Sequence, residues 1–140
     1  MPKVHEHIII EDKKTAFKKV EGKLEEIFDK LHLSESDKHN LLVSASEAVN
    51  NAMVHGNKDH PAKRVTLDVD YENEGITLTV EDEGGGFNPK DLPNPLLPEN
   101  LLKPSGRGIY IMRSLMDSVV FEFTRHGTKT IMKLKIKNEE

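Results

Sequence analysis

The feature that most constrains the fold is the apolar pattern of residues 41–56, LLVSASEAVNNAMVHG. Apolar side chains recur at spacings of three and four residues, which predicts an amphipathic helix packed on a sheet. Its apolar face consists of Leu41, Leu42, Ala45, Ala48, Val49, Ala52 and Met53. A second, polar stripe of Ser44, Glu47, Asn51 and His55 places a carboxylate and a carboxamide one helical turn apart. This stripe is either the solvated side of an ordinary helix or one wall of a site.

Size and charge narrow the class of protein. The 140 residues suit a single domain that covers residues 1–140. With 20 Lys and Arg against 24 Asp and Glu, the formal charge is −4, so the chain lacks a broad basic surface and we expect no direct nucleic-acid binding. No cysteine is present, which excludes disulfides and thiolate zinc sites. The N-terminal apolar run is too short for a signal peptide or a membrane span, so we expect a cytoplasmic protein without a membrane partner.

The remaining elements follow from hydrophobic periodicity. Strands are expected at residues 4–10, 64–71, 76–80, 119–123 and 128–136, and further helices at residues 15–33 and 108–116. Residues 34–37, SESD, predict an N-cap before the central helix, and Gly56 is expected to end that helix. Residues 88–105 contain five prolines and are expected to form a long irregular connection.

Two histidines lie two residues apart on the first expected strand. His5 and His7 would share one face of that strand, so a metal site is conceivable. No third ligand is evident nearby in the sequence, and histidines that face solvent or a partner are the simpler interpretation.

Two glycine-rich motifs follow the central helix. Asp82, Gly84 and Gly86 form D-x-G-x-G at the end of a strand, where glycines let a ligand approach the backbone and an aspartate can accept a hydrogen bond from an amino group. The second motif, S-G-x-G at residues 105–108, opens a helix whose free N–H groups suit a phosphate. Each motif alone is also compatible with a plain turn.

Together the three motifs resemble a known family. E-x-x-x-N-x-x-x-H-G at residues 47–56, D-x-G-x-G at residues 82–86 and S-G-x-G at residues 105–108 resemble the motifs of Bergerat-fold (GHKL) ATPases, which include gyrase, histidine kinases and bacterial anti-sigma-factor serine kinases. Gly127-Thr128 is similar to the glycine-threonine pair of a late strand beneath the adenine. The short chain, the His55-Gly56 ending and the segment GRGIYIMRSLMDSV are most similar to the anti-sigma kinases.

The resemblance implies a fold and a role for each matching residue. The implied fold is an α/β (α+β) two-layer sandwich with a mixed, largely antiparallel sheet and its helices on one face. Glu47 would be the general base, and Asn51 would ligate Mg²⁺ beside ATP. Asp82 would bind the adenine amino group. The other nucleotide-binding residues implied are His55, Gly84, Gly86, Gly106, Arg107, Gly108 and Thr128.

Two functions remain open. The first is an anti-sigma factor that binds a sigma factor and phosphorylates a serine or threonine of an anti-sigma-factor antagonist. The second is an ATP-gated protein-binding module without phosphotransfer, which is suggested by Lys103-Pro104 where anti-sigma kinases carry an arginine. We also expect a homodimer through the isoleucine-rich strand at residues 4–10 and the first helix, because proteins usually cover such an edge.

Overall fold

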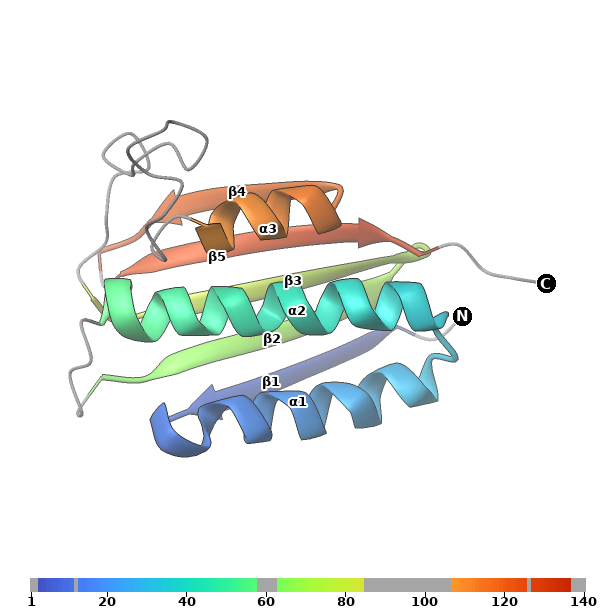
Figure 1. The fold of residues 1–140 in the computed structure, drawn as a ribbon, viewed down its shortest axis with the longest axis horizontal. Helices are drawn as coiled ribbons and strands as arrows, with labels where there is room; N and C mark the ends of the chain where they lie inside the picture. Colours follow the sequence, from blue (N-terminus) through green and yellow to red (C-terminus); the bar gives the residue numbers. More distant parts are fainter. Residues whose placement is uncertain (1–2, 12, 58–62, 85–106, 126, 137–140) are drawn as a thin grey trace.

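The computed structural model describes residues 3–11, 13–57, 63–84, 107–125 and 127–136. Three helices cover one face of a five-stranded sheet, and α2 lies between α1 and α3 (Figure 1). The elements in chain order are β1 (Val4–Ile10), α1 (Lys13–Lys30), α2 (Glu35–Asn51), the π-helical turn η1 (Ala52–Gly56), β2 (Val65–Glu72), β3 (Gly75–Asp82), α3 (Arg107–Leu115), β4 (Ser118–Phe123) and β5 (Thr128–Lys135). This arrangement confirms the predicted α+β sandwich.

The sheet has the strand order β1-β2-β3-β5-β4, with β1 and β4 at its edges. All four described pairings are antiparallel, so the described sheet contains none of the parallel pairing that a mixed sheet would include. Alternate side chains of β2 face the helices and are buried, while those between them face the open side. The expected hairpin of residues 64–80 is confirmed, and its two turn residues, Asn73 and Glu74, both have positive φ, as a type I′ turn requires.

The two long helices bury one stripe each against the sheet. Ser34 caps α2 as predicted, and its Oγ accepts a hydrogen bond from Asp37 N at 3.1 Å. The predicted apolar face of α2 is buried except Leu42, which is half-buried. On α1, Phe17 keeps the helical spacing of the core residues but is 60% exposed, because its side chain lies at the α1–α2 rim.

The central helix ends differently from the expectation. Its last turn widens into η1, and the N–H of Asn57 donates to Ala52 O at 2.8 Å. Such π-helical turns are rare and are often found near functional sites. Asn57, at φ −82°, is therefore the residue that caps this end, where the sequence predicted termination at Gly56.

The two N-terminal histidines are paired with aspartates across the β1–β2 ladder. His5 Nδ1 lies 2.5 Å from Asp70 Oδ1, and His7 Nδ1 lies 2.6 Å from Asp68 Oδ1. The Asp70 carboxylate raises the pKa of His5 above its usual value. Within the described ranges, no group of three or more His, Asp or Glu side chains is placed to hold a metal ion. The conceivable His5–His7 metal site is therefore not found, and the histidines serve as cross-strand partners.

No described helix combines the length and the apolar character that crossing a bilayer requires. The proline-rich residues 88–105 lie outside the described residues, so the expected irregular connection stays a prediction.

One buried polar group in α2 finds no partner. Ser44 is fully buried, and its Oγ has no hydrogen bond in the described structure. A buried hydroxyl without a partner loses its hydration and gains nothing in return. Serine also has a lower helix propensity than alanine.

We expect Ser44→Ala to raise the free energy of unfolding by about 1 kcal/mol in urea denaturation, because it removes the unsatisfied hydroxyl and favours the helix. Ser46→Ala is the matched control, since Ser46 lies on the same helix but is only half-buried and reports the propensity gain alone. A Ser44→Ala protein less stable than the Ser46→Ala protein would show that the Ser44 hydroxyl is bonded in solution.

Candidate functional site

The core-facing side of the sheet turns polar at one end. On β3 the inward positions Ile76, Leu78 and Val80 are followed by Asp82, which is 3% exposed. On the neighbouring strand β5 the inward series begins with two buried threonines, Thr128 and Thr130, before it becomes apolar. Val80 pairs with Thr130 in this antiparallel ladder, so the next inward position of β3, Asp82, lies beside the preceding inward position of β5, Thr128. The sheet thus carries a buried carboxylate where its periodicity calls for an apolar side chain.

Backbone N–H groups hold the Asp82 carboxylate. Gly84 N donates to Asp82 Oδ1 at 3.0 Å, and Thr128 N donates to the same oxygen at 3.2 Å. Burial raises the pKa of Asp82, and these two hydrogen bonds oppose that rise because they favour the ionised form. The carboxylate is therefore oriented by the segment that follows β3 and by the start of β5, and burial penalises its charge.

A glycine permits the close contact between β5 and Asp82. A Cβ placed on Gly127 would lie 1.9 Å from Asp82 O and 2.7 Å from Asp82 Oδ1. Side-chain carbons do not approach backbone atoms so closely, so any other residue at this position would force the two strands apart. Gly127 brings Thr128 N within reach of the carboxylate.

The start of α3 lies against the polar stripe of α2. A Cβ on Gly108 would lie 2.7 Å from Glu47 Oε2 and 3.3 Å from Asn51 Nδ2. Gly108 therefore contacts both side chains and leaves no room for a larger residue unless the glutamate moves. Glu47 and Asn51 are half-buried and share one helical face, as the sequence predicted.

The two clusters lie at the same end of the molecule. The C-terminal end of α2, the end of β3, the start of α3 and the start of β5 meet there (Figure 1). Of the predicted site residues, Glu47, Asn51, Asp82, Gly84, Gly108 and Thr128 all belong to this end. Gly86 and Gly106 lie outside the described residues, as do the side chains of His55 and Arg107.

Sequence reasoning missed Asn57. This residue is 3% exposed, and both ends of its carboxamide are hydrogen-bonded to neighbouring backbone. An asparagine directly after a helix is common in turns, so its position gave no signal of a buried role. Only the fold shows that it adjoins Glu83, the residue after Asp82.

The chemistry of these groups fits a nucleotide with a metal ion. A buried carboxylate oriented through Oδ1 can accept from an amino group, and the amide oxygen of Asn51 is a hard donor of the kind that Mg²⁺ prefers. The Gly108 backbone, free of a Cβ beside Glu47 and Asn51, offers the close approach that a phosphate needs.

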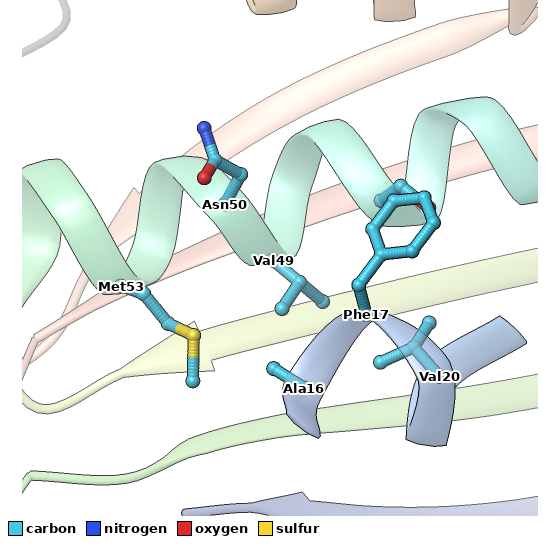
Figure 2. Close-up of a pocket in the computed structure, with 7 residues that line it drawn as sticks. Ala16, Phe17, Val20, Val49, Asn50 and Met53 are labelled. Atoms are coloured by element: carbon cyan, nitrogen blue, oxygen red, sulfur yellow. The ribbon is translucent and has the colours of Figure 1, made fainter. Parts of the chain in front are cut away.

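Two surface hollows elsewhere fit a nucleotide less well. Figure 2 shows an apolar pocket of about 120 Å³ on the α1 side of α2, whereas Glu47 and Asn51 lie against α3. It is lined by Ala16, Phe17, Val20, Ser46, Val49, Asn50 and Met53. Pockets for drug-sized ligands usually measure about 300–1,000 Å³, so this pocket is too small for a nucleoside triphosphate.

The second hollow, of about 400 Å³, lies between β1 and α1. Lys19, Lys23 and Lys30 line it, but Glu6 and Glu26 line it too. The lysine charge is therefore partly neutralised within the hollow, and Lys19 is already bound through Nζ to a backbone oxygen of β1.

Comparisons with known proteins identify the family of this chain. Residues 10–134 match the family described as the histidine kinase-like ATPase domain. The chain is 39% identical over 98 residues to an anti-sigma F factor of Clostridium perfringens (66% of this chain, 69% of the relative), and 34% identical over 102 residues to that of Clostridium novyi (69% and 70%).

Solved structures share the fold at low sequence identity. A Mycobacterium tuberculosis protein crystallised as its RsbU and RsbW domains superposes with a TM-score of 0.68 at 17% identity, over 99% of this chain and 34% of that one. The mycobacterial sensor histidine kinase MprB superposes with a TM-score of 0.56 at 15% identity, over 97% of this chain and 100% of that one. With its polar sheet end, its α2 stripe and a family match across most of its length, this chain belongs to the histidine kinase-like ATPase domain family.

Proposed function

We propose that this protein is an ATP-dependent anti-sigma factor that binds a sigma factor and phosphorylates a serine or threonine of its antagonist protein. The observation that carries the proposal is the contact of Gly108 with both Glu47 and Asn51. This contact places a candidate general base, a candidate metal ligand and the N-terminal end of a helix next to one another. The relatives named anti-sigma F factor support the regulatory role.

Asp82 would recognise the base. Its Oδ1 already accepts from Gly84 N and Thr128 N, so we assign Oδ2 to the adenine amino group. Thr128 is 1% exposed beside the carboxylate and would support the adenine. A hydrogen bond from a neutral donor to a charged acceptor in a buried site is stronger than one between neutral groups, which favours adenine over bases that lack the amino group.

The phosphate groups of ATP would lie beside Asn51, Gly108 and Glu47. Asn51 Oδ1 would ligate the magnesium ion, and the backbone at Gly108 would bind phosphate oxygens. A magnesium ion bound there supplies positive charge that offsets the charge of the phosphates. Glu47 would take the proton of the attacking hydroxyl, a role that requires its carboxylate to be ionised and close to the phosphate groups.

The proposal includes a homodimer. β1 is an edge strand, Ile9 is 37% exposed, and α1 lies alongside, so this side offers apolar surface for a second copy. The Lys19 bond to Ile9 O already satisfies one backbone group there, which limits strand-to-strand pairing at that point. A molar mass from light scattering at tens of micromolar distinguishes a dimer from a monomer.

We expect Asp82→Asn to weaken ATP binding by about 10- to 100-fold while it stabilises the fold at neutral pH. The pKa of Asp82 is raised in the folded chain, so its ionisation destabilises the fold once the pH exceeds that pKa. Asparagine avoids this penalty, and its advantage in the free energy of unfolding should be largest near pH 7 and shrink as the pH falls towards 4. Calorimetry and urea denaturation measure the two effects. An advantage that grows at acid pH would mean that the carboxylate is not penalised by burial.

We expect Glu47→Gln to keep Mg²⁺-dependent ATP binding near the wild-type value and to slow phosphotransfer by about 10² to 10⁴. Glutamine keeps the size of the side chain but cannot accept the proton. Asn51→Ala should impair both binding and transfer, because it removes the metal ligand. Asn50→Ala is the matched control: Asn50 is the same residue type one position earlier, but it lies at the α1–α2 pocket.

The rate is measured as single-turnover phosphorylation of candidate antagonist proteins, or as ATP hydrolysis if no antagonist is found. A binding titration measures the affinity for Mg²⁺-ATP. An unchanged rate in Glu47→Gln would remove the general-base role. A wild-type protein that transfers no phosphate, yet binds a partner only with ATP, would be the ATP-gated module instead.

A further inference from the structure

Asn57 connects two parts of the site that are far apart in the sequence. It follows η1, at the end of the helix that carries Glu47 and Asn51, and is almost completely buried. Its Oδ1 accepts from Glu83 N at 2.7 Å, and its Nδ2 donates to Arg64 O at 3.0 Å. Both ends of this one carboxamide are therefore engaged with the backbone.

The three residues form a closed triangle of hydrogen bonds. Arg64 N donates to the side-chain Oε1 of Glu83 at 2.5 Å, which completes the ring. The triangle ties the end of η1 to the residue before β2 and to the residue after β3. Among these three hydrogen bonds, the bond between Glu83 N and Asn57 Oδ1 holds the peptide that follows Asp82.

That peptide is one of the two backbone segments that orient the Asp82 carboxylate. Glu83 N belongs to the peptide bond that joins Asp82 to Glu83, and the next N–H, that of Gly84, donates to Asp82 Oδ1. Rotation of the first peptide would move Gly84 N away from the carboxylate. A buried hydrogen bond that fixes this peptide plane therefore acts together with the Thr128 N–H to hold the direction of the acceptor.

We propose that Asn57 is a positioning residue for base recognition: through Glu83 N it holds the Asp82 carboxylate in the orientation that receives an exocyclic amino group. This inference rests on the proposed role of Asp82. Asn57 also links the segment after Asp82 to the end of α2 that carries Asn51. The alternative is that Asn57 only satisfies buried backbone groups and stabilises the fold.

The test compares ATP with inosine triphosphate, whose base carries an oxygen where adenine carries the amino group. In the wild type we expect ATP to bind about 10- to 100-fold more tightly, because the adenine amino group donates to Asp82 at the position where inosine triphosphate would place an acceptor oxygen against the carboxylate. Asn57→Ala should reduce this preference by about tenfold, while Mg²⁺-tripolyphosphate, which has no base, should bind as in the wild type.

Two further variants separate positioning from stability. Asn57→Asp keeps an acceptor for Glu83 N but loses the donor to Arg64 O, so it should be less stable yet retain most of the base preference. Ser34→Ala removes the cap of α2, which typically costs about 1 kcal/mol, far from the base site, and should leave the preference unchanged. Asn57→Ser, a milder change with the same expectation as alanine, serves if Asn57→Ala does not fold.

The outcomes are distinct. A folded Asn57→Ala or Asn57→Ser protein that keeps the wild-type preference overturns the positioning role and leaves the role of Asp82 intact. Loss of the preference in Asn57→Asp to the same extent as in Asn57→Ala would also overturn it, since the acceptor is retained. A wild-type protein with no preference for ATP, or an Asp82→Asn protein that keeps it, refutes the proposed role of Asp82 and this inference with it.

Discussion

The site depends on one buried carboxylate. Asp82 occupies a core-facing position at the end of β3, where the alternation of the strand would otherwise place an apolar side chain. Its environment exists because three backbone features converge: the N–H groups of Gly84 and Thr128, and the missing Cβ of Gly127. Burial works against the charge, so the fold retains a group that is unfavourable for stability, as expected for a residue kept for the proposed recognition of the base.

The helices supply the second half of the site through close packing. α2 presents Glu47 and Asn51 towards α3, and Gly108 allows the start of α3 to touch both. At the same end, the π-helical turn η1 extends α2 and places Asn57 beside the segment that follows β3. One helix thus contributes to both halves: its side chains Glu47 and Asn51 lie against the start of α3, and Asn57 at its end is bonded to the residue after Asp82.

Much of this could be predicted because it follows from periodicity and local chemistry. The spacing of Glu47 and Asn51 defines one helical face, and Ser34 is a recognisable cap. The contacts of Gly127 with Asp82 and of Asn57 with Glu83 could not be derived from spacing, because they join segments that are distant in sequence. The π-helical turn was missed because a Gly after a helix predicts an ordinary stop. The exposure of Phe17 could not be derived from the sequence, because its spacing matches that of core residues.

The most direct test of a single nucleotide site at this end is an NMR titration of the ¹⁵N-labelled protein with Mg²⁺-ATP. If the two clusters form one site, the backbone signals of Gly84 and Thr128 and those of Asn51 and Gly108 should shift together, with the same apparent affinity. Shifts confined to the α1–α2 pocket around Val20, or to the lysine-lined hollow around Lys23, would contradict it.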